Sequence, residues 1–381
     1  MAETRHYPAD ALERFAAQAC RALGADPDVA AEVAGHLVRA NLAGHDSHGM
    51  LRLPQYVAQA DRGALRPGAR PEFVREAASI ALVDAGWGFG HFSTAFALDW
   101  ALEAARRHGI AAAAIRRSNH IGRLGEYAER AARRGLIALV TVGSAGPTGG
   151  VVLPHGGRER FLGTNPWAIG VPAAGRGPMI FDAATSVIAQ GKIHVARAAG
   201  ASLPPGCIVD RDGRPSTAVA DYDAGGALLP VGSPGAGHKG YGLALASALL
   251  GGLALAAEPE PGDPDDSTPP DREGEGGRIG GVFVAAIDPG AFGSGERYAA
   301  LVGATLDAAN RVPPATGVEA VLTPGEPEAR MRERRGREGI PLPAATWDEL
   351  RALAARFDLP LLEAPEAAEA EGPAPGGSGP G

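Results

Sequence analysis

One stretch near the N-terminus, Gly-His-Asp-Ser-His-Gly-Met-Leu-Arg-Leu-Pro-Gln-Tyr, carries the residue types of an acid–base site. Asp46 and Ser47 are both good N-cap residues, so the sequence predicts a helix that begins here. On that helix His48, Arg52 and Tyr56 are four residues apart and share one face.

This face combines three chemical groups. An imidazole can move a proton near neutral pH, a guanidinium fork fits a carboxylate, and a phenol can donate or accept a hydrogen bond. An enzyme that acts on a small carboxylic acid needs such a set. The alternative is a solvated helix start with an ordinary surface arginine and tyrosine.

A second candidate for proton transfer is His120, which stands beside Ser118 and Asn119. It follows a predicted strand over 110–116 and precedes a helix that ends near 134. Loops held by a rigid scaffold often carry functional residues. The alternative is a structural or solvated histidine.

The two lysines stand out among 36 basic residues, because all the others are arginine. Lys192 and Lys239 both lie beside a glycine, where a compact ammonium group can be needed. Gly237-His238-Lys239-Gly240 precedes an apolar helix over 241–254. Glycine amides at a helix start beside a lysine form a cradle for anions such as the phosphates of a cofactor.

The remaining elements follow from periodicity and turn signals. The sequence predicts helices over 8–23, 27–43, 93–108 and 347–356, the last capped by Thr346, and a charged helix that ends near 336. It predicts strands over 79–84, 136–142, 180–182, 282–288 and 317–322.

The glycines over residues 86–90 invite a dinucleotide-binding assignment, since they lie between a strand and a helix. Their spacing is G-x-G-x-G rather than G-x-G-x-x-G, and no acidic residue closes a following strand at the expected distance. We interpret them as a tight turn.

Length and composition indicate a globular protein of two or three domains, with 381 residues, 45% hydrophobic and 21% charged. No run of eighteen apolar residues predicts a membrane span, and the first residues lack a secretory pattern. Cys20 and Cys207 are too few for a disulfide scaffold or a thiolate zinc site. We therefore expect a cytoplasmic protein.

The net charge of −8 is concentrated in two segments. Residues 258–278 hold eight acidic residues against two arginines, and residues 363–371 hold four acidic residues and no base. The rest is nearly neutral, so nothing indicates a nucleic-acid surface. We expect disorder over 256–278 and from 365 to the end.

Six short motifs, in order over about residues 10–345, together resemble the malate/L-lactate dehydrogenase family that is unrelated to Rossmann-type enzymes. This family also holds sulfolactate, ureidoglycolate and diketogulonate dehydrogenases and reductases of cyclic imines such as piperideine-2-carboxylate. The motifs are Asp46-Ser47-His48-Gly49 with Arg52 and Tyr56, Ser118-Asn119-His120-Ile121-Gly122, Leu162-Gly163-Thr164-Asn165-Pro166, Asp182-Ala183-Ala184-Thr185-Ser186 with Gly191-Lys192, His238-Lys239-Gly240-Tyr241-Gly242, and Pro324-Gly325-Glu326.

The resemblance implies a homodimeric NAD- or NADP-dependent oxidoreductase with an α/β, non-Rossmann cofactor fold and a helical N-terminal region. The expected divisions are a helical region carrying the catalytic motif (1–75), an α/β region for cofactor and substrate (76–255), the acidic insertion (256–278), strands and helices that pack back on the body (279–364) and the tail (365–381).

The resemblance also assigns roles to residues. His48 matches a proton donor in some members and His120 a base in others, and which one moves the proton stays open. Substrate contacts are expected at Ser47, Arg52 and Tyr56. Cofactor contacts are expected at Ser144, Asp182, Thr185, Ser186, Lys239, Gly240, Gly325 and Glu326. Thr148 stands where an aromatic residue is expected, which leaves the wall of the substrate pocket uncertain.

The expected reaction is hydride transfer between nicotinamide and C2 of a small 2-hydroxy acid or its 2-oxo partner. Reduction of a cyclic 2-imino acid uses the same geometry and remains an alternative. Two other classes are a metal-dependent hydrolase with His45, Asp46 and His48 as ligands and a catalytically inactive ligand-binding homologue. We expect no bound metal and no nucleic-acid or membrane partner.

Overall fold

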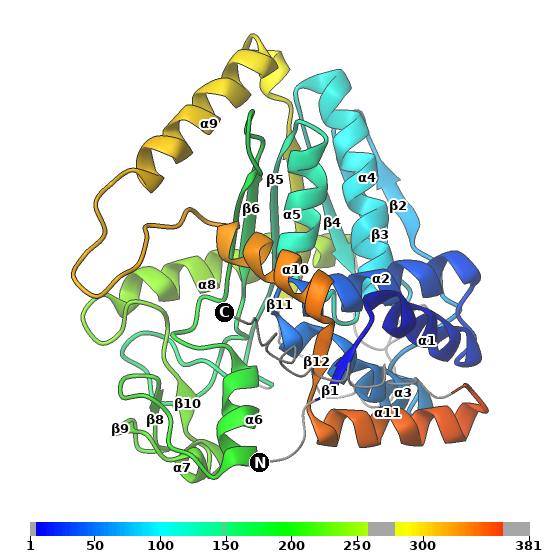
Figure 1. Ribbon diagram of the computed structural model, residues 1–381, viewed down its shortest axis with the longest axis vertical. Coiled ribbons are helices and arrows are strands. Elements are labelled where there is room, and N and C mark those ends of the chain that lie inside the picture. The colour runs from blue at the N-terminus through cyan, green and yellow to red at the C-terminus, as the bar shows by residue number, and fades with distance from the viewer. Residues whose placement is uncertain (1–4, 148, 258–278, 361–381) are drawn as a thin grey trace, which may run out of the picture.

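The computed structural model describes residues 5–147, 149–257 and 279–360, and its central feature is a seven-stranded sheet (Figure 1). The strand order is β2-β3-β4-β11-β5-β6-β7. Their bounds are β2 Glu72–Glu76, β3 Ile80–Asp84, β4 Ile110–Arg116, β5 Ile137–Ala145, β6 Trp167–Val171, β7 Met179–Ala183 and β11 Ile279–Ile287.

Only β3 and β4 pair in parallel, and every other neighbouring pair in this sheet is antiparallel. This is not the parallel sheet of a dinucleotide-binding fold. Gly86 and Trp87 have φ of 57° and 61°, so the glycine-rich segment is a tight turn as predicted. The α/β, non-Rossmann fold class is confirmed.

Helices cover both faces of the sheet. On one face lie α4 (Gly90–His108) and α5 (Leu124–Arg133), which share a core with alternate residues of the strands such as Val140. The next residue of β5, Thr141, points to the opposite face and hydrogen bonds to Ser247 of α8 at 2.6 Å. α8 spans Gly237–Gly251 and continues as the 3₁₀ helix η3, Gly252–Ala257.

A second core joins the two ends of the chain. It lies among α1 (Ala9–Ala22), α2 (Pro27–Leu42), α3 (Leu53–Asp61) and α11 (Ala344–Phe357). Strands β1 (Arg5–Tyr7) and β12 (Ile340–Leu342) pair antiparallel beside these helices. The C-terminal elements therefore pack back on the N-terminal helices (Figure 1).

A smaller lobe, at the lower left of Figure 1, is built from short elements. These are α6 Gln190–Ala199, β8 Ile208–Val209, β9 Pro215–Ser216, α7 Val219–Asp223 and β10 Ala227–Leu228. The remaining elements are the 3₁₀ helix η5 (Pro289–Phe292), α9 (Gly295–Asn310) and α10 (Glu326–Glu338).

Two predictions for the C-terminal part are wrong. Residues 317–322 form no strand, because Val318 and Leu322 have no sheet edge to join and stay exposed by 50% and 37%. Thr346 does not cap the last helix, which begins at Ala344 after Pro343, a residue whose fixed φ suits a helix start. Sequence analysis predicted neither α9 nor β6.

Some predictions concern residues outside the described part of the chain. They are the altered pocket residue Thr148, nearly all of the expected insertion at 256–278 and the expected tail from 365.

The helix from Gly237 to Ala256, 20 residues long, could span a membrane by length and composition alone. The sequence pattern did not predict this. About a third of this window is buried in the protein. The helix packs on β5 and β11, as core helices of similar composition also do.

Candidate active site

The catalytic motif does not form the single helix that its spacing predicts. Asp46–His48 is one 3₁₀ turn, η1, and Met50–Arg52 is a second, η2, before α3 begins. Gly49 separates them with φ −96° and ψ −149°. A Cβ at this position would lie 2.1 Å from Oδ1 of Asn41, which accepts a hydrogen bond from the Met50 amide at 2.8 Å. The buried Asn41 side chain thus accepts from the Met50 N–H the hydrogen bond that a backbone carbonyl would accept in a continuous helix.

The broken helix nevertheless brings the predicted residues together. His48 Nδ1 lies 3.1 Å from Nε2 of His120, and the two rings stack at 5.2 Å. The Tyr56 hydroxyl lies 2.7 Å from His120 Nδ1 and 3.3 Å from Nε2 of His91. These four side chains form one hydrogen-bonded chain. His91 was missed by sequence analysis, because a lone histidine at a helix start carries no distinguishing signal.

The loop that carries His120 is fixed from both sides. The Asn119 amide donates to the carbonyl of Trp87 at 2.7 Å and that of Ala64 at 3.1 Å. A Cβ on Gly90, the first residue of α4, would lie 2.6 Å from the His120 carbonyl oxygen. The start of α4 therefore packs directly under the histidine.

The surroundings keep these histidines uncharged. Burial lowers the pKa of His48 and of His91 to about 3 each, and lowers that of His120 well below its usual value. The positive charge of Arg52 acts in the same direction on all three. His48 and His120 are partly exposed, whereas His91 is fully buried. Only the first two can be reached by a small molecule.

Arg52 is held with its guanidinium beside this chain. Its Nε donates to the Ser47 carbonyl and one terminal nitrogen donates to the Gln55 side chain, both at 2.6 Å. The second terminal nitrogen has no hydrogen-bond partner in the part of the chain that the structure describes. It is the available donor for a carboxylate.

The catalytic loop is also tied to α10. Asp46 accepts two hydrogen bonds from Arg335, at 2.6 and 3.0 Å, and one from the Asn41 amide at 2.5 Å. His45 lies 3.3 Å from Glu328. The side chains of His45, Asp46 and His48 therefore point to different partners, and no group of three metal-ligating side chains is found among the described residues.

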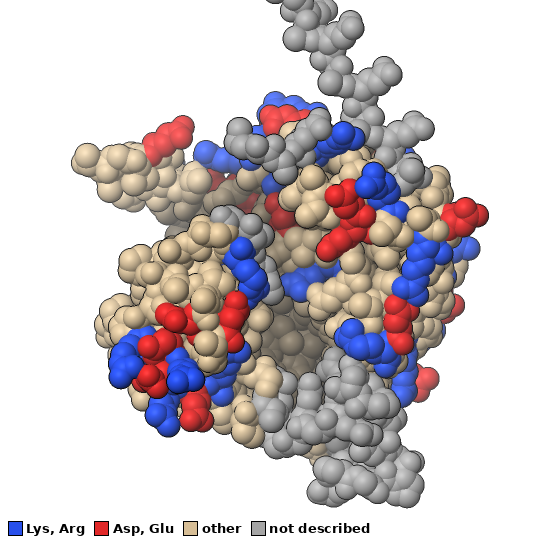
Figure 2. Space-filling model, turned by 90° about the horizontal axis from the view of Figure 1, so that it is seen from below, with Lys and Arg blue, Asp and Glu red and all other residues tan. Residues whose placement is uncertain are grey.

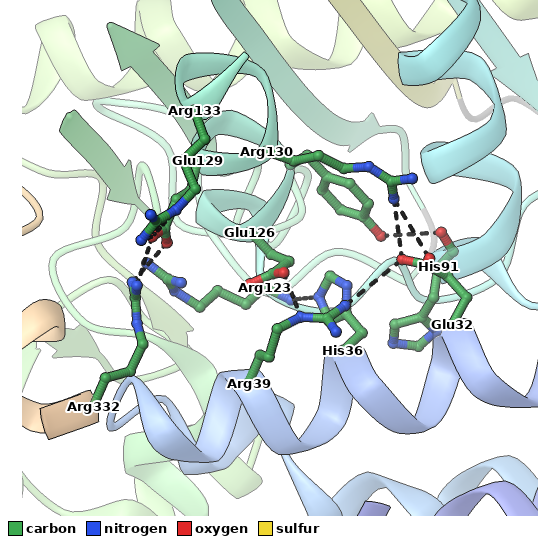
Figure 3. A network of polar contacts seen from close by, with 11 residues as sticks. Glu32, His36, Arg39, His91, Arg123, Glu126, Glu129, Arg130, Arg133 and Arg332 are labelled. Carbon is green, nitrogen blue, oxygen red and sulfur yellow. Dashed lines mark hydrogen bonds and ion pairs between the residues drawn. The ribbon is translucent and has the colours of Figure 1, made fainter. Parts of the chain in front are cut away.

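A network of ion pairs joins α2 to α5 beside the site (Figure 3). Arg39 pairs with Glu126 at 2.5 Å, and Arg130 reaches Glu32 at 3.3 Å. In the same network the Arg123 backbone N–H donates to Nε2 of His36 at 2.9 Å. Figure 3 shows His36 beside His91, and their ring centroids are 4.9 Å apart, so the network adjoins the buried end of the site.

Several expected cofactor residues lie around the ends of β5 and β7. The backbone of Ser144 exchanges two hydrogen bonds with the Asn165 side chain, at 3.0 and 3.1 Å. The Thr185 hydroxyl donates to the carbonyls of Thr164 and Asn165. Ser186 donates to the Ile188 carbonyl at 2.7 Å. Asn165 itself has φ 41°, a strained value that its side-chain bonds stabilise.

Asp182, the second-last residue of β7, lies in a closed environment. It accepts a hydrogen bond from the Gly125 amide at 2.7 Å and lies 3.6 Å from Nε of Arg123. Burial raises its pKa, and the Arg123 charge partly offsets that rise. The Arg123 side chain is 1% exposed, and sequence analysis did not identify it.

The other expected cofactor positions are divided between two helix starts. Lys239 is exposed in the first turn of α8, and Gly240 lies so close to the Val231 carbonyl that a Cβ would be 2.2 Å from it. Gly325 precedes α10 with φ +99°. The Glu326 carboxylate is used within its own loop, since it accepts from the Thr323 backbone at 2.5 Å and from Asn310 at 2.7 Å.

A hollow partly separates the smaller lobe from the helical body. Figure 2 shows this hollow between the lobe and the helical body, with basic side chains on its walls. At the start of α6, a Cβ on Gly191 would lie 3.0 Å from that of Ser47. The lobe therefore reaches the loop that carries His48.

Comparison with known proteins identifies the class of this fold and site. Residues 7–351 match the family described as malate/L-lactate dehydrogenase. Hydroxycarboxylate dehydrogenase B of Escherichia coli K12 is 34% identical over 368 residues, which cover 94% of this chain and 96% of that protein. Delta(1)-pyrroline-2-carboxylate reductase of Ancylobacter novellus is 36% identical over 340 residues, covering 88% and 93%. The crystal structure of malate dehydrogenase from Entamoeba histolytica superposes with a TM-score of 0.86 at 26% identity, covering 94% and 99%.

The chain belongs to the malate/L-lactate dehydrogenase family. It is an NAD(P)-dependent oxidoreductase of hydroxy acids, as its motifs predict.

Proposed function

We propose that this enzyme transfers a hydride between nicotinamide and C2 of a small 2-hydroxy acid or 2-oxo acid, with His48 as the group that exchanges the proton. The observation that carries the assignment is the hydrogen-bond pattern of the two histidines. Both ring nitrogens of His120 are used, by His48 and Tyr56, whereas Nε2 of His48 has no partner among the described residues. His48 then contacts the substrate and His120 orients it.

In the oxidation, the C2 hydroxyl gives its proton to Nε2 of His48 as the C2–H bond breaks. A nicotinamide ring held beside His48 would supply the acceptor for the hydride that leaves C2. In the proton arrangement that this step requires, the Nδ1–H of His48 is directed at His120 Nε2, which stabilises the positive charge of protonated His48. In the reduction, protonated His48 returns the proton to the oxygen at C2.

The substrate carboxylate binds Arg52 in this proposal. The guanidinium has a free terminal nitrogen and stands beside His48, so C2 of a bound 2-hydroxy acid lies within reach of the imidazole. Ser47 of the catalytic loop provides a further substrate contact. Tyr56 acts on the substrate indirectly, through its hydrogen bond to His120.

The residues fit a nicotinamide dinucleotide. At the α8 start no side chain caps the helix, so its first amides are available for a phosphate, next to the exposed Lys239. Gly163 is needed beside Ser144, since a Cβ would lie 3.0 Å from the Ser144 hydroxyl. The residues that would hold the dinucleotide are Ser144, Asp182, Thr185, Ser186, Lys239, Gly240, Gly325 and Glu326.

The test is reduction of a panel of 2-oxo acids with NADH and with NADPH, followed by loss of nicotinamide absorbance. The panel includes pyruvate, oxaloacetate, sulfopyruvate and a diketogulonate. We expect turnover with one substrate and one nucleotide. Arg52→Met should then raise the KM of that acid by about 10- to 100-fold, the value of a charged hydrogen-bonded contact, whereas Arg107→Met at the far end of α4 should not. An unchanged KM in Arg52→Met contradicts the carboxylate assignment.

A cyclic 2-imino acid is the second candidate substrate, favoured by the 36% identity to a delta(1)-pyrroline-2-carboxylate reductase. Protonation at the imine nitrogen uses the same His48 atom. The panel therefore includes pyrroline-2-carboxylate and piperideine-2-carboxylate, and their turnover without that of any 2-oxo acid would select this alternative.

We also propose a homodimer. From Gly242 to Ala256 the exposed residues of α8 and η3 are all apolar, and Leu243, Leu249 and Leu253 are about half exposed. Such a continuous apolar face on a helix typically marks an interface. A second copy of the chain is the occupant that the resemblance implies. Cys20 and Cys207 are free and buried, which supports a cytoplasmic location.

A further inference from the structure

His91 is a fully buried histidine with no part in the proton transfer proposed above. It is the second residue of α4, and its Nε2 lies 3.3 Å from the Tyr56 hydroxyl. Its Nδ1 has no hydrogen-bond partner in the described part of the chain. The rings of His36 and Tyr56 lie edge-on to it at 4.9 and 5.5 Å.

The four linked side chains have only two consistent arrangements of their protons. Each contact between His91, Tyr56, His120 and His48 contains one hydrogen, and each uncharged imidazole carries one. If His91 Nε2 donates to Tyr56, then Tyr56 donates to His120 Nδ1, and His120 Nε2 donates to His48 Nδ1. The proton of His48 is then on Nε2. If His91 carries its proton on Nδ1, every bond is reversed and Nε2 of His48 is bare.

The position of His91 favours the first arrangement. The second would bury an N–H with no acceptor, a situation that folded proteins rarely contain. His91 is also in the first turn of α4, where the helix dipole favours a lone pair over an N–H.

The His91 ring is closely packed on the edge that carries Cδ2. Gly122 approaches it so closely that a Cβ there would lie 2.8 Å from its Cδ2 and 2.4 Å from Nε2 of His36. His36 already accepts the Arg123 amide on that nitrogen. The edges of both rings are therefore fixed.

We propose that His91 is a positioning residue that fixes the tautomers of this chain, so that resting His48 presents Nε2–H to the substrate. That N–H donates a hydrogen bond to the carbonyl oxygen of a 2-oxo acid or to the nitrogen of a 2-imino acid. A 2-hydroxy acid needs the reverse arrangement. To reach it, the protons in the three contacts each shift to the other partner, the proton on His48 Nε2 leaves, and a proton is added at His91 Nδ1. The consequence for the substrate rests on the proposed function, whereas the tautomers are a property of the protein alone.

The first experiment measures the tautomers directly. In protein labelled with ¹⁵N-histidine, two-bond ¹H–¹⁵N correlations at pH 7 distinguish protonated Nε2 from protonated Nδ1, and the spectrum of His91→Gln identifies the His91 signals. We expect His91, His120 and His48 to carry the proton on Nε2. A proton on Nδ1 of His91 overturns the proposal.

The second experiment compares two substitutions of His91. The amide of His91→Gln can still donate to Tyr56, whereas His91→Leu cannot. We expect His91→Leu to raise the KM of the 2-oxo or 2-imino acid about 3- to 10-fold, which is the effect of one hydrogen bond. The KM of the nucleotide should not change. His91→Gln should stay close to the wild type.

The control is Tyr127→Phe, which removes a nearby buried hydroxyl. This hydroxyl donates to the Ile121 carbonyl and is not one of the four linked side chains. Equal losses in His91→Gln and His91→Leu, with folding intact by circular dichroism, overturn the positioning role. If the tautomers are as expected but no panel compound is turned over, the tautomer assignment stands and the proposed function fails.

Discussion

The chemistry of this site depends on histidines that the fold keeps uncharged. His36, His48, His91 and His120 all have a pKa lowered by burial, to about 3 for His48 and His91. In the unfolded chain the same side chains titrate near 6.5. The unfolded state therefore binds protons below pH 6.5 that the folded state does not bind.

This difference predicts an acid-sensitive protein. A lowered folded-state pKa means that the stability is present above pH 6.5 and is lost as the pH falls, by about 1.4 kcal/mol per pH unit for each such histidine. Urea unfolding at pH 7.5, 6.5 and 5.5 measures it, in a range above the titration of ordinary carboxylates. His91→Gln should lose less stability per pH unit than the wild type, by about one proton. A midpoint that does not change between pH 7.5 and 5.5 contradicts buried neutral histidines.

Single residues were predictable where their chemistry and spacing were both unusual. His48, Arg52, Tyr56 and His120 were identified from type and position, and the structure brings them together. His91 could not be identified, since its role depends on contacts such as that with Tyr56, 35 positions away. Partners that distant in the chain leave no local pattern.

The catalytic loop is positioned by α10, a helix almost 290 residues further along the chain. Arg335 is 10% exposed on its side chain and binds both oxygens of Asp46, two residues before His48. Arg332 of the same helix binds both oxygens of Glu129 on α5, at 2.5 and 2.6 Å. α10 therefore connects the catalytic loop with the helix that packs on β5 and β6.

Arg335→Met should lower kcat strongly and lower the thermal stability only slightly. Without the pair, Asp46 remains bound only to Asn41 and the loop can shift His48 away from His120. We expect kcat to fall by about 10-fold or more, because small displacements of a catalytic group are costly, and Tm to fall by a few degrees. Steady-state kinetics and thermal unfolding measure both quantities.

The matched control for this change is Arg337→Met, which removes an exposed arginine of the same helix that pairs only loosely with Glu333, at 3.8 Å. It should leave kcat and Tm unchanged. A normal kcat in Arg335→Met would show that the loop holds His48 without help from α10.

Elements were predictable where local periodicity dominated. The helices at α1, α2 and α4 and the strands β3 and β4 agree with their predicted ranges within a few residues. The predicted helix at Asp46 was wrong because Asn41 replaces its backbone bonds and Gly49 interrupts it, which is a tertiary effect. The strand over 317–322 was wrong for a similar reason, since strands need partners that the sequence does not name.

The whole chain leaves apolar surface that its own fold does not cover. The outward side of α8 and η3 is apolar from Gly242 to Ala256, and β7 ends the sheet with Phe181 exposed by 41%. α9 stands apart from the sheet in Figure 1, and Gly303 is its only buried residue. An apolar helix face and an exposed aromatic side chain at the sheet edge favour association with a second copy.

A charge on this surface should therefore separate the proposed dimer. Leu249→Glu combined with Leu253→Glu places two carboxylates on the outward face of α8 and η3, where both leucines are about half exposed and little internal packing is lost. We expect light scattering after gel filtration to change from the mass of two chains to that of one, with the circular dichroism spectrum retained. Val74→Glu, on the opposite edge strand β2 and 45% exposed, is the control and should stay dimeric. A wild-type protein with the mass of one chain would contradict the homodimer, and a dimeric double variant would place the interface away from α8.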